Sequence, residues 1–306
     1  MSKDNSSNHH YYKETDGGLT DSWLPNNSRK ITIAILNKLP DDPILINQNS
    51  IFGTSFLINY KKRIYLITAK HILENLSEKP FYLTFSYIDP ISDVPTIFTL
   101  KGKDLDGHSL EWHFPKSEYD DFAFLHLCQQ ELELLTRQEA KVDFGAYVVE
   151  KDFGNPLKIK NMVGELTAAL GYPEKGTSIY ADGRRSFFSQ SMISKLEMYD
   201  LRNGKIVLRV STNNPEQPYV ALKTKPHGLS GGPIFIRYLD VPERPFSLIG
   251  IVTDVTPAAQ DEENDNGDVA DRPYLNCIKG ITFNKILAFI DQVEIDCECM
   301  YNTNFD

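Results

Sequence analysis

KPHGLSGGPI, residues 225–234, places one serine, Ser230, among three glycines, the last of which directly precedes a proline and an apolar run. Glycine loses more conformational entropy on folding than other residues, so three within five positions indicate a backbone that side chains would not permit. A loop of this kind can present a serine hydroxyl in a cleft while nearby N–H groups face the oxygen of an attacked carbonyl. The same letters also fit an ordinary glycine-rich turn before a strand, so the rest of the chain has to decide.

The composition is typical of a soluble globular protein. The chain has 306 residues, of which 41% are hydrophobic and 24% charged, and its formal net charge is −10. This length allows one large domain or two moderate ones. The acidic balance argues against nucleic acid and against an anionic membrane surface as partners. No apolar run is long enough to span a bilayer. The sequence predicts no cofactor and no metal site.

The chain begins with a polar segment, residues 1–28, that we expect to be a disordered tail. It lacks the apolar core of a signal peptide, which favours a cytoplasmic location. Four cysteines in a chain of this length are too few for a disulfide framework, so we expect free thiols.

Short apolar and β-branched runs separated by turn residues follow the tail and predict strands. Residues 131–140 and 282–293 have a helical pattern instead, the second with apolar residues at helical spacing. The strands are predicted at 31–36, 53–58, 63–68, 81–87, 96–100, 122–127, 146–149, 166–170, 206–210, 233–236 and 247–253.

Two of these strands carry side chains that complement Ser230. His71 directly follows the strand at 63–68, and Asp120 and Asp121 directly precede the one at 122–127. Attack by a serine hydroxyl needs a neutral imidazole to take its proton, and a carboxylate to orient that imidazole and stabilise its charged form. The chain therefore supplies one candidate for each role, in the order His, Asp, Ser.

The motifs TAKH at 68–71, DFAFL at 121–125 and GLSGGP at 228–233 together resemble those of the trypsin/chymotrypsin-type serine proteases. GTSF at 53–56, GYP at 171–173 and the strand after the serine resemble the same family. The resemblance covers residues 31 to 293 and is closest to disulfide-free bacterial members. It implies an all-β fold of two antiparallel six-stranded β-barrels with a C-terminal helix. The expected division is a tail at 1–28, barrels at 29–135 and 136–295, and a tail at 296–306.

The resemblance also implies roles for individual residues. His71 would be the general base, Asp121 the orienting carboxylate and Ser230 the nucleophile, with the N–H groups of Gly228 and Ser230 forming an oxyanion hole. Asp121 is favoured over Asp120 because it adjoins the apolar run. Leu229 replaces the aspartate that secreted members carry before the serine, so we expect no activation by a newly freed N-terminus.

The substrate pocket is harder to read from the sequence. By position, it would be lined by Thr224, His227, Thr253, Asp254 and Val255. Valine at 255, where the family commonly has glycine, would narrow the entrance and favour small or medium apolar side chains. Asp254 and the acidic loop at 261–268 would instead attract basic segments, although that loop is also compatible with a solvated insertion.

The sequence therefore predicts a soluble serine endopeptidase that acts on protein or peptide substrates, with one specific partner protein as a narrow case. A protease-fold binding module that no longer cleaves, and an esterase-like hydrolase with the same triad, are the alternatives. A bacterial, defence-associated role is a further hypothesis.

Overall fold

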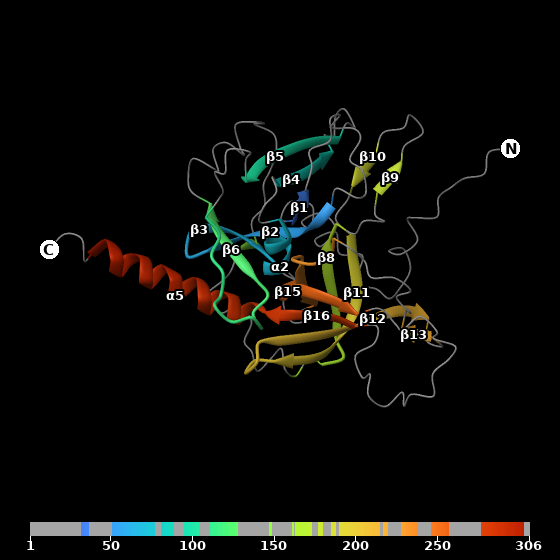
Figure 1. Cartoon of the computed structure of the whole chain (residues 1–306). Coiled ribbons are helices and arrows are strands. Elements are labelled where there is room, and N and C mark those ends of the chain that lie inside the picture. Colours follow the sequence, from blue (N-terminus) through green and yellow to red (C-terminus); the bar gives the residue numbers. More distant parts are fainter. Residues whose placement is uncertain are drawn as a thin grey trace, which may run out of the picture.

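The computed structural model contains two seven-stranded β-sheets, one above the other, and a long C-terminal helix beside them (Figure 1). No helix in the described part of the chain is both long and apolar enough to cross a membrane. The structure describes residues 32–36, 51–76, 81–88, 95–103, 111–127, 147–148, 161, 163–172, 177–179, 185–187, 190–214, 217–219, 228–237, 246–256 and 277–302.

The first sheet is built from β1 (Thr32–Leu36), β2 (Ile51–Tyr60), β3 (Arg63–Thr68), β4 (Phe81–Ile88), β5 (Pro95–Lys103), β6 (Ala123–Leu127) and β7 (Tyr147–Val148). Its strand order is β5-β4-β1-β2-β3-β6, and β7 pairs in parallel with β2. Helix α2 (Lys70–Leu76) follows β3 directly.

The second sheet is built from β8 (Leu166–Gly171), β11 (Gln190–Asp200), β12 (Lys205–Asn214), β13 (Gln217–Tyr219), β14 (Pro233–Arg237), β15 (Phe246–Thr256) and β16 (Cys277–Thr282). Its order is β11-β8-β14-β15-β16-β12, and β11 also pairs with β12, so six strands close into a barrel. A separate hairpin joins β9 (Thr177–Ile179) to β10 (Arg185–Phe187).

The expectation of two closed barrels is therefore met by the second sheet, whereas the first is a half-barrel. Its end strands β5 and β6 do not pair in the described part of the chain.

The outer edge of β6 pairs with a single residue, His113, in an isolated bridge. The His113 N–H donates to the Phe124 carbonyl at 2.8 Å, and the Phe124 N–H donates back at 3.2 Å.

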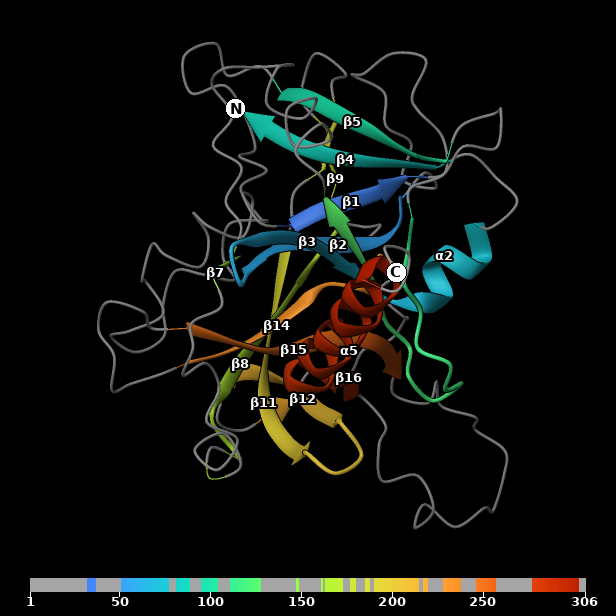
Figure 2. The same ribbon diagram turned by 90° about the vertical axis from the view of Figure 1, so that its left-hand side faces the viewer.

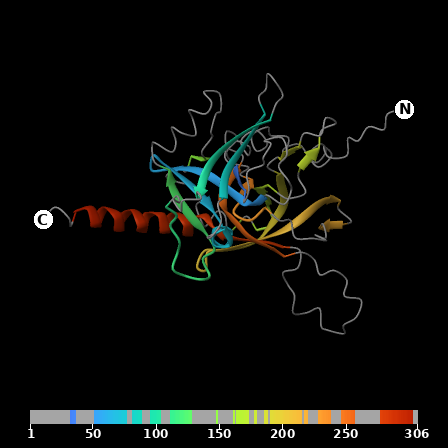
Figure 3. The ribbon, with the colours of Figure 1, turned by 45° about the horizontal axis from the view of Figure 1, so that its top comes forward.

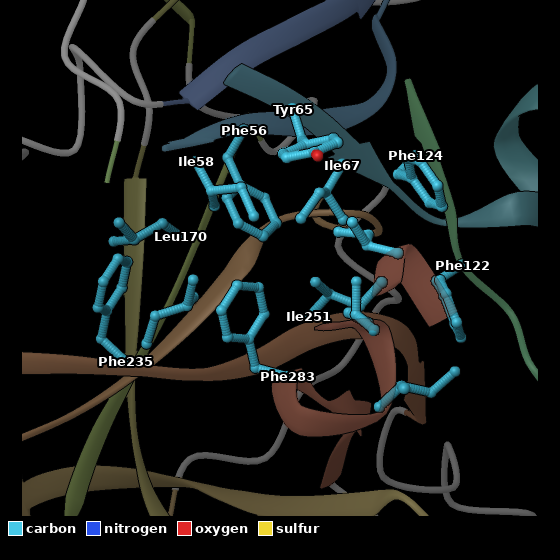
Figure 4. Close-up of a cluster of buried hydrophobic side chains, with 14 of the residues drawn as sticks. Phe56, Ile58, Tyr65, Ile67, Phe122, Phe124, Leu170, Phe235, Ile251 and Phe283 are labelled. Carbon is cyan, nitrogen blue, oxygen red and sulfur yellow. The ribbon is translucent and has the colours of Figure 1, made fainter. Parts of the chain in front are cut away.

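The strands at the centre of the molecule are buried on both faces, which explains why they read as continuous apolar runs. Side chains alternate between the two faces of a strand. In β2, Phe56 and Ile58 face a cluster shared by both sheets, whereas Leu57 lies in a cluster confined to the first sheet. In β14, Phe235 enters the shared cluster, and its two neighbours enter the core of the second barrel. Figure 4 shows the shared cluster, with the labelled side chains of the two sheets pointing toward one another.

Helix α5 (Phe283–Asn302) contributes side chains to the apolar cluster that the two sheets share. Its residues Phe283, Ile286 and Ile290 are fully buried in the shared cluster. Figure 2 shows the helix with the first sheet above it and the second below. Its C-terminal half extends away from both sheets (Figure 3).

Several elements differ from the sequence expectation. Helix α5 continues to Asn302, past the tail boundary expected at residue 296, because its last turns contain neither glycine nor proline. Strand β7 lies beyond the expected domain boundary near residue 135 but pairs with β2 of the first sheet. The helix expected at 131–140, the boundary itself, the tail at 1–28 and the acidic loop at 261–268 lie outside the described residues.

Candidate active site

His71 is the second residue of α2, immediately beyond the end of β3. The apolar side chains of this short helix, Ile72, Leu73 and Leu76, are buried against the first sheet. They fix the helix in place, while the side chain of His71 keeps 39% of its surface exposed. A ring held by a rigid element and still accessible can contact a molecule outside the core.

Asp121 reaches His71 because β3 and β6 are antiparallel neighbours. Thr68 at the end of β3 pairs with Ala123 at the start of β6. The residues that follow β3 and those that precede β6 therefore meet at the same end of the sheet. In this way the strand register brings together two side chains that are 50 positions apart in the sequence.

The Asp121 carboxylate holds His71 at two points. Its Oδ1 accepts the backbone N–H of His71 at 2.9 Å, and its Oδ2 lies 2.7 Å from Nδ1 of the ring. An ionised carboxylate can only accept hydrogen bonds, so Nδ1 carries the proton, and a neutral ring presents Nε2 as an acceptor. The pair fixes both the orientation and the tautomer of the imidazole, as proton transfer through Nε2 requires.

Asp120, the competing carboxylate in the sequence, points elsewhere. It forms an ion pair with Lys285 of α5. The geometry therefore joins Asp121, and not Asp120, to His71.

Ser230 lies in a loop that only glycine can form. Gly228 and Gly231 have φ angles of 88° and 81°, in the left-handed region that side chains disfavour. Space is also lacking, because a Cβ on Gly228 would lie 2.1 Å from the Tyr172 carbonyl oxygen. A Cβ on Gly232 would lie 1.8 Å from the Leu170 oxygen. These glycines thus let the loop pack directly against neighbouring backbone.

The Ser230 loop is seated on the first sheet, close to His71. The Thr54 N–H in β2 donates to the Ser230 carbonyl at 2.9 Å. A Cβ on Gly231 would lie 2.5 Å from Thr68 Oγ1 and 3.0 Å from the nitrogen of Ala69, two residues before His71. The loop from the second barrel and the histidine from the first sheet therefore share one site. No hydrogen bond joins the Ser230 hydroxyl to the His71 ring, although both residues are described, and such bonds often tighten only when substrate binds.

The backbone donors of this loop divide into two groups. The Gly231 N–H donates to the Val252 carbonyl at 2.7 Å and the Gly232 N–H to the Leu229 carbonyl at 3.1 Å. The N–H groups of Gly228 and Ser230, by contrast, donate to no other described residue. These two are the donors that the resemblance assigns to an oxyanion hole, and no described residue accepts a hydrogen bond from either of them.

Leu229 and Thr54 anchor the loop from below. Leu229 is fully buried in the apolar core of the second barrel. An apolar side chain at this position needs no charged partner. Thr54 Oγ1 donates to the Gly228 carbonyl at 2.6 Å and accepts the Tyr172 N–H at 3.0 Å. Sequence reasoning missed this role of Thr54. Its only signal was its place in the GTSF and GYP fragments.

The predicted pocket residues have mixed locations. Thr253 and Asp254 are half-buried on β15, and the Asp254 carboxylate lies 4.0 Å from Lys279 Nζ. Val255 is only 2% exposed and packs in the core of the second barrel. Thr224 and His227 lie outside the described residues.

The described residues contain no group of three or more His, Cys, Asp or Glu side chains arranged to hold a metal ion.

Comparison of the chain with protein-family models gave no match, and none of the curated proteins matches its sequence. Among solved structures, the chain is similar to a protease named Anisep from Arthrobacter nicotinovorans. The identity is 15% and the TM-score 0.40, with 83% of this chain and 90% of that one covered.

Proposed function

We propose that this chain is a serine endopeptidase that cleaves peptide bonds through an acyl-enzyme. The observation that carries the proposal is the two-point hold of Asp121 on His71, beside a left-handed glycine loop that bears Ser230. The combination matters because a carboxylate-bound histidine is common as a structural pair. Two N–H groups beside a half-buried serine, neither bonded to any described residue, have a use mainly where an oxyanion forms.

The residues divide the reaction as follows. Ser230 Oγ attacks the substrate carbonyl while His71 Nε2 takes its proton, and Asp121 stabilises the resulting imidazolium. The N–H groups of Gly228 and Ser230 donate hydrogen bonds to the negatively charged oxygen of the tetrahedral intermediate and stabilise it. His71 returns the proton to the leaving amine, then activates a water molecule that releases the acyl group from Ser230.

An extended peptide fits this site better than a small ester does. Strand β14 pairs with β15 only as far as Ile251, and the Ser230 loop contacts the next residue, Val252. Beyond Ile251, β15 continues to Thr256 while β14 does not, and β16 pairs with its other edge. A substrate segment can add to such an edge as a further strand, with its carbonyl next to Ser230. Protein or peptide substrates, in a narrow set, are therefore the class we propose.

The first test is covalent labelling with a fluorophosphonate probe, which reacts only with an activated serine. We expect the wild-type chain to be labelled and Ser230→Ala to remain unlabelled with the same thermal unfolding temperature. Cleavage of a peptide library with blocked termini then separates an endopeptidase from an esterase. Absence of Ser230-dependent labelling, also in the presence of cell lysate, would favour the alternative of a binding module without activity.

Two neighbouring carboxylates provide a matched pair for the second test. Asp121→Asn removes the charge that fixes the tautomer of His71, so the labelling rate should fall by roughly three to four orders of magnitude. Asp120→Asn removes an equal charge one residue away and should leave the rate at neutral pH within about threefold of wild type. The opposite ranking of the two variants would assign the orienting role to Asp120.

A further inference from the structure

The segment that carries Asp121 sends three consecutive side chains in three directions. Asp120 pairs with Lys285 of α5, Asp121 with His71, and Phe122 is buried against Phe289 of α5 with 5.6 Å between ring centroids. The Phe122 N–H also donates to the Asp120 carbonyl at 3.0 Å, which closes a tight bend around Asp121. Two adjacent carboxylates thus lie at the edge of the site, and α5 contacts the residues on either side of Asp121.

Lys285 is placed by the second barrel. It lies in the first turn of α5, and its Nζ is 3.5 Å from the carbonyl oxygen of Asn203 in the β11–β12 turn. Its aliphatic stem covers Gly204, where an added Cβ would lie 2.4 Å from Lys285 Cδ. The Gly204 carbonyl in turn accepts the Thr282 N–H at 2.9 Å, just before the helix begins. The ammonium group is therefore held at a fixed position relative to Asp120.

Without a cation beside it, the Asp120 carboxylate would disturb the pair formed by Asp121 and His71. Its side chain is 14% exposed, whereas that of Lys285 is 34% exposed. A carboxylate so far removed from water interacts more strongly with nearby charges than an exposed one does. Unpaired, it would repel Asp121, compete with it for His71 and add a second negative charge beside the imidazole.

We propose that Lys285 is a positioning residue for the reaction at Ser230, and this inference rests on the proposed function. It holds Asp120 away from His71 and cancels the charge of Asp120, so that Asp121 alone orients the imidazole. Because Lys285 belongs to the C-terminal helix, the geometry of the acid in the first sheet depends on an element that follows the second barrel.

The other described charged side chains of α2 and α5 form ion pairs. Lys70 and Glu74 of α2 pair with each other at 3.4 Å, and Asp291 and Glu294 of α5 pair with residues of the β2–β3 hairpin. Among the described residues, Lys285 is the one cation that contacts the Asp120 carboxylate. The remaining charged or titratable groups of the acid segment and around the β11–β12 turn are Glu111, His113, Lys116, Glu118, Tyr119, Asp200, Arg202 and Lys205.

The experiment compares four variants with the wild type: Lys285→Met, Lys285→Arg, Asp120→Asn and the double variant Lys285→Met/Asp120→Asn. Two quantities are measured for each. One is the pH dependence of the fluorophosphonate labelling rate of Ser230. The other is the low-field proton resonance of the His71 Nδ1–H, which reports the bond to Asp121 without any need for activity. Thermal unfolding temperatures serve as the check on folding.

Lys285→Met should lower the labelling rate about tenfold at neutral pH and move the acid limb of the profile upward by about half a pH unit. Its low-field resonance should shift or broaden. In the double variant, the labelling rate, the pH of the acid limb and the position of the resonance should return most of the way to their wild-type values, because the unpaired charge is gone. Lys285→Arg should behave like the wild type. Asp120→Asn alone should move the acid limb to lower pH, because it leaves the ammonium unpaired.

The proposal is overturned if the double variant is no better than Lys285→Met, since a purely structural tie between α5 and the acid segment would give that result. It is equally overturned if the acid limb and the resonance stay unchanged in Lys285→Met. Should Lys285→Met not fold, an unchanged acid limb and resonance in Asp120→Asn would still contradict it. If the wild type is never labelled, the proposed function fails, whereas the resonances of the four variants still test the role of Lys285.

Discussion

Gly231 combines two reasons for being a glycine, and they can be separated by experiment. Its φ is 81°, and a Cβ on it would lie 2.0 Å from the backbone oxygen of Thr54. Gly164 has a φ of 95° but no atom within 4 Å of the added Cβ. The two positions share the strained backbone and differ in the space around it.

Gly231→Ala should therefore cost far more stability than Gly164→Ala. The backbone strain alone is worth about 1 kcal/mol, which we expect for Gly164→Ala. The collision with a backbone oxygen that is itself bonded to Thr68 adds to this, so Gly231→Ala should lose roughly 3 kcal/mol or more. Urea unfolding measures both changes in stability. Labelling of Ser230 should fall in Gly231→Ala and stay unchanged in Gly164→Ala. Equal losses of stability would mean that the loop moves away from Thr54 at little cost.

The residues of the candidate site were predictable where their signal is local. A serine among glycines, and a histidine or an aspartate at the end of an apolar run, can be recognised from neighbouring letters. The Thr54 hydroxyl bonds to a residue 174 positions away, and Lys285 pairs with one 165 positions away. No spacing rule relates such partners, because only the packing of the two sheets brings them together. Asp120 and Asp121 illustrate the same limit, since the sequence could rank them but the contact with Lys285 separates them.

At the scale of elements, α5 also forms polar contacts with the β2–β3 hairpin, whose second strand leads to His71. Lys61 Nζ lies 2.6 Å from the Asp291 carboxylate, and the Tyr60 hydroxyl donates to the same carboxylate at 3.0 Å. Burial and the hydrogen bond to Asp291 raise the pKa of Tyr60 above its ordinary value of 10.0. The hydrogen bond to Asp291 raises the pKa of Lys61 above 10.5.

These two pKa shifts predict that the contacts between α5 and the β2–β3 hairpin stabilise the fold less at alkaline pH. A group whose pKa is raised on folding stabilises the fold at pH values below its unfolded pKa, and this contribution is lost as pH rises through the folded pKa. Both groups act in the same direction, so the unfolding temperature should fall as pH rises above about 10. Asp291→Asn removes the cause of much of both shifts and should give a shallower decline. Asp200→Asn, which removes the carboxylate at the end of β11, should keep the wild-type slope. Parallel profiles for wild type and Asp291→Asn would rule out this coupling.

The elements themselves differ in how far the sequence reveals them. Strands β3 and β8 were predictable because both faces are buried, which gives unbroken apolar runs. Helix α2 was missed because it has only seven residues, although its Ile72, Leu73 and Leu76 have helical spacing. Strand β11 was missed because its polar and apolar residues alternate poorly. The Asn203-Gly204 pair that ends the following turn is a hairpin signal and could have indicated it.

At the scale of the whole molecule, the two sheets share one core. The shared cluster takes Phe56 from the first sheet, Phe235 from the second and Phe283 from α5, all fully buried. The candidate site lies across the same junction, with His71 on one side and Ser230 on the other. Each sheet also has its own cluster, exemplified by Leu66 in the first and Leu208 in the second. Apolar surface buried between two units stabilises both together, so we expect the sheets to unfold as one cooperative unit.

This coupling can be tested by hydrogen exchange of peptides from each sheet at increasing denaturant. Phe283→Ala should cost about 3–5 kcal/mol and lower the unfolding midpoint of both sheets by the same amount, because the removed ring belongs to the cluster that the two sheets share. Leu208→Ala is the sharper case, since Leu208 lies only in the core of the second barrel. If the sheets are coupled, peptides of the first sheet should lose protection together with those of the second in this variant as well. If only the second sheet is weakened, the shared core is not strong enough to bind the two, and the site at the junction would form only when both sheets happen to be folded.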